Sequence, residues 1–184
     1  MIYVLLAIAA GILGYGIYAF NRLTRLKYLV SEGWSGIDVQ LKRRAELIPN
    51  LVEVVKAYAA HERSLFETLT RLRAEAMGGG SISAQAQTGQ AMAAQLSRLL
   101  ALAEAYPELK ADANFRKLQE QLAEIEDQLQ MSRRYYNGTV RNLNTMIEQA
   151  PSNLVAQSFG FAQAEFFQID GDAQRQVPQV VLER

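Results

Sequence analysis

The sequence predicts an all-α protein in which a single N-terminal transmembrane helix is continuous with a long antiparallel four-helix bundle, followed by a short aromatic-rich C-terminal tail. Residues 2–20 carry no charge, and much of the remaining chain repeats apolar residues at three- and four-residue spacings. The chain has only four prolines and no long strand-like run. We expect a transmembrane helix at residues 1–21, a bundle at 22–151 and a tail at 152–184.

The apolar run at residues 2–20 has the length of a membrane span. At about 1.5 Å per residue it makes a helix of roughly 28 Å, close to the thickness of a bilayer's hydrocarbon core. A signal peptide is the alternative, but no basic residue precedes the run, and the cleavage-like triplet at residues 7–9 lies too near the start. Basic residues follow at Arg22, Arg25 and Lys27, which places the N-terminus outside and the bundle in the cytoplasm.

Small residues lie on one face of this span. Ala7 and Gly11 are four residues apart, as are Ala10 and Gly14. Such spacing lets membrane helices approach closely, so we expect contacts between copies at Ala7, Gly11 and Gly14. The alternative is that the span is simply rich in alanine and glycine, as membrane helices are.

The first helix is expected to pass from the membrane into the bundle without a linker. Its apolar stripe continues through Trp34 and ends near residue 48, and Gly33 and Gly36 weaken it locally. Pro49 either ends this helix or lies in the first turn of the next one.

Three further helices complete the predicted bundle. They span about residues 50–77, 84–105 and 112–149, and a Gly-Gly-Gly-Ser sequence separates the first two. The last has a near-heptad apolar seam typical of a coiled coil, and either Asp112 or Asn114 caps its start.

The tail concentrates aromatic residues. A short helix with Ser152 as cap and Gly160 as stop is expected, and it is followed by a cluster of phenylalanines: Phe159, Phe161, Phe166 and Phe167. We expect this cluster to pack over one end of the bundle. The alternative is contact with a neighbouring subunit or with the membrane surface.

The sequence shows none of the common motifs of enzyme active sites. There is no cysteine, and the single histidine, His61, lacks the second histidine of a zinc-protease motif because residue 65 is leucine. No nucleophile elbow, phosphate loop or dinucleotide motif is present. We therefore predict no enzyme, no catalytic residue, no metal and no cofactor. Lys plus Arg and Asp plus Glu are both 19, so no nucleic-acid partner is expected.

Polar residues beside the apolar stripes form a predicted structural layer inside the bundle. Its members are Trp34 and Asp38 on the first helix and Arg134, Asn137, Arg141 and Asn144 on the last. A charge near a bundle core needs a partner, so we expect Asp38 to pair with Arg134 or Arg141. A buried polar site for a ligand is the alternative.

Three blocks of the sequence resemble the LemA family. They are WSGIDVQLKRRAELIPNLVEVVKAYAAHE (34–62), YPELKADANFRKLQEQL (106–122) and RRYYNGTVRNLNTMIEQAPSNLVAQSFGF (133–161), and the closing FF and VPQV also fit. The resemblance implies a bacterial membrane protein with one transmembrane helix, a helical bundle, and no established activity or cofactor. The family's magnetosome branch implies a role in membrane shaping.

Together these observations predict a single-pass scaffold or interaction protein of the bacterial cytoplasmic (inner) membrane. Its expected partners are the lipid bilayer and other copies of the chain, with a further membrane protein as a possible partner. The alternative function is an adaptor or regulator of a membrane partner such as a quality-control protease.

Overall fold

The computed structural model describes residues 1–168, which form six α-helices and no strand within that range. The helices are α1 (Ile2–Lys56), α2 (Arg63–Met77), α3 (Ile82–Glu104), α4 (Pro107–Ala111), α5 (Ala113–Glu148) and α6 (Ser152–Ser158). The predicted all-α class is confirmed. The VPQV sequence of the tail lies outside the described residues.

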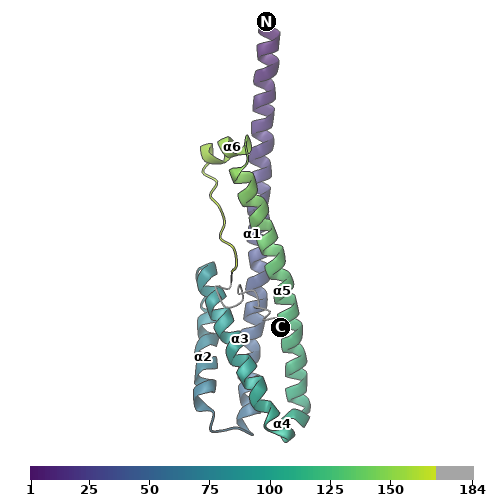
Figure 1. The fold of residues 1–184 in the computed structure, drawn as a ribbon, viewed down its shortest axis with the longest axis vertical. Coiled ribbons are helices and arrows are strands. Elements are labelled where there is room, and N and C mark those ends of the chain that lie inside the picture. The colour runs from purple at the N-terminus through teal and green to yellow at the C-terminus, as the bar shows by residue number, and fades with distance from the viewer. Residues whose placement is uncertain (169–184) are drawn as a thin grey trace, which may run out of the picture.

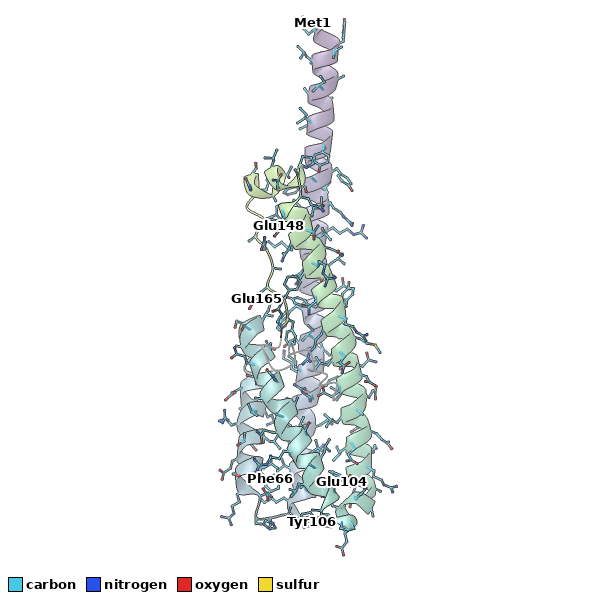
Figure 2. The ribbon with its side chains drawn as sticks, in the orientation of Figure 1. Met1, Phe66, Glu104, Tyr106, Glu148 and Glu165 are labelled. Carbon is cyan, nitrogen blue, oxygen red and sulfur yellow. The ribbon has the colours of Figure 1, made fainter. Side chains whose placement is uncertain are left out.

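Two long helices, α1 and α5, run antiparallel and form the axis of the molecule (Figure 1). The α2–α3 hairpin covers the half of this pair farther from the N-terminus, and α4 closes that end. Beyond α5, the chain turns at α6 and runs back along the other half of the pair. The first turns of α1 extend past every other element. Figure 2 shows Met1 at the tip of this extension and Tyr106 at the opposite end.

Pro49 does not end the first helix, because α1 continues through it to Lys56. A proline inside a helix costs about 3 kcal/mol. The residues around it, Ile48, Leu51 and Val55, are at most 1% exposed. Burying three such side chains stabilises the fold by roughly 5–9 kcal/mol, which outweighs the lost backbone hydrogen bond. The predicted boundary near residue 48 was therefore wrong.

The reversal into α2 occurs at residues 57–62 and has no glycine or proline. The Tyr58 and Ala59 amides both donate to the Val55 carbonyl oxygen, at 3.0 and 2.9 Å. Because this turn replaces the start of the helix predicted from residue 50, α2 is only 15 residues long. Four helices consequently lie side by side only where α2 and α3 flank the long pair.

Side-chain caps hold the starts of α3 and α5, and only the one on α5 was predicted. The Ser81 hydroxyl accepts a hydrogen bond from the Ala84 amide at 3.1 Å. Asp112 Oδ1 accepts from the amides of Asn114 and Phe115 at 2.8 and 3.0 Å, so Asp112 is the cap of α5. Each such cap stabilises its helix by about 1 kcal/mol.

The core follows the long pair in three clusters. The largest lies among α1, α2, α3 and α5, a second contains Ile37, Tyr136 and Phe167, and a third contains Leu23, Leu143 and Ala156. The C-terminal residues thus supply core beyond the hairpin at Ala156, and Phe167 shares the second cluster with Ala86 of α3.

Gly33 explains how closely the long helices approach. A Cβ at this position would lie 3.1 Å from the Tyr136 Cα and 3.3 Å from a Tyr135 ring carbon. Only glycine fits without displacing α5, and α1 is unbroken across both Gly33 and Gly36. The span and the bundle therefore share one continuous helix.

Candidate functional site

The C-terminal segment (residues 159–168) is held on α5 by two asparagines. Asn144 Nδ2 donates to the Ala164 carbonyl at 3.0 Å, and the Ala164 amide donates to Asn144 Oδ1 at 2.9 Å. Asn137 makes the same pair of bonds with Phe167, at 3.1 and 2.9 Å. Each side-chain amide therefore pairs with the backbone as a neighbouring β-strand would.

The spacing of the two asparagines matches the segment they hold. Seven residues along a helix cover about 10.5 Å. Three residues of extended chain, from Ala164 to Phe167, cover about 10 Å. The two directions are opposite, since the earlier asparagine, Asn137, binds the later residue, Phe167. The two asparagines thus fix the position of the C-terminal segment along α5, and we call this pairing the asparagine register.

Tyr136 adds a third bond to the segment. Its hydroxyl donates to the Glu165 carbonyl oxygen at 2.7 Å, and the residue is fully buried. Burial and, to a smaller extent, the Glu165 carboxylate raise the pKa of Tyr136 above its usual value. The neutral hydroxyl is the form that can donate this bond.

Aromatic contacts seal the end of the segment. Phe167 is 3% exposed, and its ring centroid lies 6.0 Å from that of Trp34, which in turn lies 5.8 Å from that of Tyr136. The Arg133 guanidinium carbon lies 5.0 Å from the Phe167 ring centroid, a cation–π distance. Burial, followed by the charge of Arg44, lowers the pKa of Arg133, and Glu126 partly offsets this effect.

Gly160 turns the chain from α6 into this position. Its φ of 69° is left-handed, the Phe161 amide donates to the Ala156 carbonyl at 2.9 Å, and the Gly160 amide donates to the Gln157 carbonyl at 3.3 Å. This Schellman arrangement confirms Gly160 as the helix stop. Ser152 is not the cap, because Pro151 holds that position. The Ser152 hydroxyl instead makes hydrogen bonds with the Met146 and Gln149 carbonyl oxygens.

The predicted polar layer is divided in the structure. Trp34, Asn137 and Asn144 meet at the C-terminal segment, whereas Arg134 and Arg141 are exposed. The partner of the two asparagines is therefore the backbone of the C-terminal segment, not a ligand or another helix.

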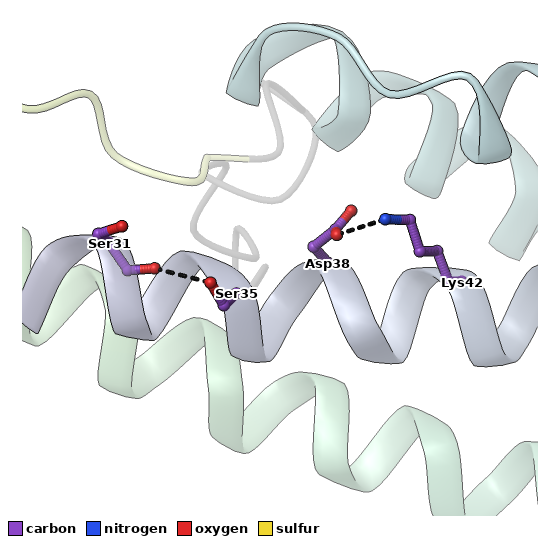
Figure 3. Close-up of polar contacts among 4 residues, drawn as sticks. All are labelled: Ser31, Ser35, Asp38 and Lys42. Carbon is purple, nitrogen blue, oxygen red and sulfur yellow. Dashed lines mark hydrogen bonds and ion pairs between the residues drawn. The ribbon is translucent and has the colours of Figure 1, made fainter.

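Asp38 has a different partner from the one we expected. It pairs with Lys42, one turn along the same helix, with 2.7 Å between Nζ and Oδ2 (Figure 3). Both side chains are partly exposed, at 25% for Asp38 and 43% for Lys42, so the pair is worth less than about 1 kcal/mol. Figure 3 also shows the Ser35 hydroxyl bonded to the Ser31 carbonyl oxygen, on the same side of α1.

A partly buried ion pair, absent from the sequence predictions, centres on an arginine that links three helices. Arg44 of α1 is fully buried, and it donates through Nη1 to Glu126 of α5 at 2.7 Å and through Nη2 to the Gly89 carbonyl of α3 at 2.8 Å. A Cβ at Gly89 would lie 3.2 Å from Arg44 Nη2. The small residues that begin α3 therefore make room for this arginine. The spacing of apolar residues does not predict that Arg44 is buried.

The small-residue face of the span is open in the part of the chain that the structure describes. One helix, α1, is long and apolar enough to cross a membrane, with a mean hydropathy of 2.0 and 6% of that stretch buried. Ala7 is exposed, and a Cβ at Gly11 or Gly14 would meet nothing within 4 Å. Contact between copies through this face stays a prediction.

We expected the four phenylalanines to pack together over one end of the bundle, but they lie at two separate places. Phe159 and Phe161 lie against Phe20, with ring centroids 4.9 and 5.7 Å away, where the span meets the bundle. Phe166 and Phe167 lie midway along the molecule. The segment is distributed along the long pair because the asparagine register extends it.

Within residues 1–168, no cluster of three or more potential metal ligands of the types His, Cys, Asp and Glu occurs. His61 Nε2 lies 3.3 Å from the Tyr106 hydroxyl, at the end of the molecule opposite Met1.

Comparison with known proteins identifies the relatives of this chain. The model of the LemA family matches residues 33–181. The chain is similar to magnetosome protein MamQ 2 of Paramagnetospirillum magneticum, with 28% identity over 162 residues that cover 73% of this chain and 59% of the relative. Identity to magnetosome protein MamQ of Magnetospirillum gryphiswaldense is 25% over 177 residues, covering 81% and 65%. The chain thus spans less than two thirds of the length of these relatives, and their names state no enzymatic activity.

Proposed function

Because the chain belongs to the LemA family, we propose that it is a single-pass membrane scaffold that self-associates and holds a helical bundle at the membrane surface. The family match confirms the resemblance found in the sequence blocks, and together with the apolar helix it makes the chain a membrane-associated helical protein. The observation that carries the proposal is the continuity of α1 from the span into the core. A bundle built on that helix cannot reorient without moving the span.

The proposed location is the bacterial cytoplasmic membrane, with the N-terminus outside and the bundle inside. Arg22, Arg25 and Lys27 follow the span directly, and such basic residues favour the cytoplasmic side.

Self-association is supported by the face formed by Ala7, Gly11 and Gly14. Membrane helices pack through such small residues because their backbones can approach closely. Among the described residues, a Cβ added at Gly11 or Gly14 would meet no neighbour within 4 Å. The relatives are named as magnetosome proteins, which favours a role in shaping or organising membrane.

A structural role is also favoured over an enzymatic one. Several buried or half-buried polar groups in residues 1–168 are engaged with other parts of the chain, as Arg44 is with Glu126 and Asn137 with Phe167. The cavity lined by Arg133, Arg134 and Arg141 carries three cations and no carboxylate or histidine among its described lining residues, which disfavours general acid–base chemistry there.

The test is the mass of the purified protein in a mild detergent, measured by light scattering after size exclusion. The proposal predicts a homo-oligomer, and the double substitution Gly11→Leu/Gly14→Leu should reduce it toward the monomer. Ala9→Leu is the control, because it adds a leucine to the opposite face of the helix. A monomer that is recovered with a different membrane protein would contradict the scaffold and support the adaptor alternative.

A further inference from the structure

A groove runs along α1 where the span meets the bundle. It consists of two adjoining cavities of about 410 and 430 Å³ that share Phe20 and Phe159. We call it the interfacial groove. It is formed by one face of α1 and by the turn that leaves α6.

The two halves of the interfacial groove differ in polarity. The half within the span is lined by apolar residues and glycine: Ile12, Leu13, Gly16, Ile17, Phe20 and Phe159. The other half adds Lys27 and three hydroxyl side chains, those of Thr24, Tyr28 and Ser31. The groove is thus apolar on the membrane side and has a cation and hydrogen-bond donors on the bundle side.

The position of the polar half matches the headgroup layer of a bilayer. That layer is roughly 6 Å thick on each side of the hydrocarbon core. If the core ends at Phe20, Thr24 lies about 6 Å and Lys27 about 10 Å beyond it along the helix axis. Helical side chains tilt toward the N-terminus of their helix, so the Lys27 ammonium leans back toward the membrane.

Lys27 makes no ion pair with any residue between 1 and 168, and its side chain is exposed to the groove. Among residues 1–168, no carboxylate lines either half. The charge of the groove therefore complements an anion.

The turn after α6 also has the character of a membrane surface. Leu154 is 65% exposed and Phe159 is 64% exposed, although both are large and apolar. In Figure 1, α6 lies across the long pair at the level where the free part of α1 begins. Aromatic and aliphatic side chains at this depth would enter the boundary between acyl chains and headgroups.

We propose that the interfacial groove binds one anionic phospholipid from the leaflet that faces the bundle. Its phosphate lies at Lys27, with Thr24 and Tyr28 donating hydrogen bonds, and an acyl chain lies along the span against Gly16 and Phe159. A Cβ at Gly16 would meet nothing within 4 Å, so the absent side chain leaves space for this chain. The inference rests on the membrane span of the proposed function and does not require self-association.

Native mass spectrometry of the full chain in detergent, titrated with phosphatidylglycerol or phosphatidylcholine, tests this site. We expect one phosphatidylglycerol retained per protomer, and weaker retention of phosphatidylcholine. Lys27→Gln should lower the affinity for phosphatidylglycerol about fivefold, the effect of one basic residue near an anionic surface. Gly16→Leu should lower retention of both lipids, since leucine fills the apolar half.

Arg25→Gln is the matched control. It removes the same charge two residues away, on the opposite side of α1, and Arg25 does not line the groove. Equal losses for Lys27→Gln and Arg25→Gln would overturn the proposal, because they would indicate general attraction to anionic lipid. Competition by soluble glycerol phosphate would also overturn it and indicate a free-phosphate site. Resistance of the protein to carbonate extraction reports the span separately, so a failed lipid site is distinguishable from a failed membrane assignment.

Discussion

The asparagine register predicts the local stability of the C-terminal segment. In Asn137→Ala, the Phe167 amide and carbonyl both lose their side-chain partner, at 2.9 and 3.1 Å. Each such hydrogen bond contributes about 1 kcal/mol net. The loss of two should lower the free energy of opening at this point by about 2 kcal/mol, which corresponds to a roughly 30-fold faster amide exchange.

Hydrogen–deuterium exchange of the full chain in detergent measures this effect at single amides. Asn137→Ala should accelerate exchange of Phe167 more than that of Ala164, and Asn144→Ala should do the reverse. Asn142→Ala is the matched control, because Asn142 is an exposed residue of the same helix and has no hydrogen bond to the segment among residues 1–168. Unchanged exchange of Phe167 in Asn137→Ala would refute the register.

Three further predictions concern the packing of the long helices. Glu126→Ala leaves the fully buried Arg44 charge with only the Gly89 carbonyl as partner and should lower the free energy of unfolding by about 3 kcal/mol. Arg44→Met keeps the side-chain volume and removes the charge, so it should lower the free energy of unfolding by less. A larger loss for Arg44→Met would contradict the assignment of the Arg44–Glu126 pair. Gly33→Ala should lower the unfolding midpoint, because the added Cβ would press on the Tyr136 backbone. At Gly36 the nearest neighbour of an added Cβ is 3.7 Å away, so Gly36→Ala should raise the free energy of unfolding by up to about 1 kcal/mol. Equal effects of the two substitutions would exclude a close approach of the helices at Gly33. Since the folded-state pKa of Tyr136 is raised, its contribution is complete below the ordinary tyrosine pKa of about 10 and is lost as pH rises through the folded value. Denaturant titrations from neutral pH upward should therefore show a steeper loss for wild type than for Tyr136→Phe, and parallel curves would contradict it.

Much of this fold is encoded in local patterns that the sequence displays. The buried seam of α5 includes Phe115, Leu122, Leu129 and Leu143, which are regularly spaced, and Asp112 and Ser81 are ordinary caps. Apolar periodicity therefore predicted α3 and the continuity of α1 with the span, and periodicity together with a cap at Asp112 predicted α5. These signals depend only on residues close together in the chain.

The errors arise where tertiary packing overrides local preference. Pro49 is a strong helix breaker, yet the buried residues on both sides keep α1 helical, and the true reversal at residues 57–62 contains no breaker. Whether the chain reverses at Pro49 or at residues 57–62 depends on where the α2–α3 hairpin packs, and that is a tertiary property.

The polar contacts were predictable only in part. Asn137 and Asn144 were recognised as sharing a face, but their partner is backbone, which has no sequence signature. Arg44 is one of three consecutive basic residues, and only its burial against Gly89 separates it from Lys42 and Arg43. From the sequence alone, Gly33 predicts only a local loss of helix stability. Its role in letting α1 and α5 approach closely follows from the position of α5.

The central claim is that one rigid helix joins the membrane span to the bundle. Because the chain has no cysteine, Tyr18→Cys and Val39→Cys, both at exposed positions, allow specific spin labelling of the protein in lipid nanodiscs, diluted with unlabelled copies. A continuous helix of 21 residue steps predicts a narrow distance distribution centred near 32 Å between the labelled backbones. A broad distribution or a markedly shorter distance would show a break between span and bundle, and would contradict the account.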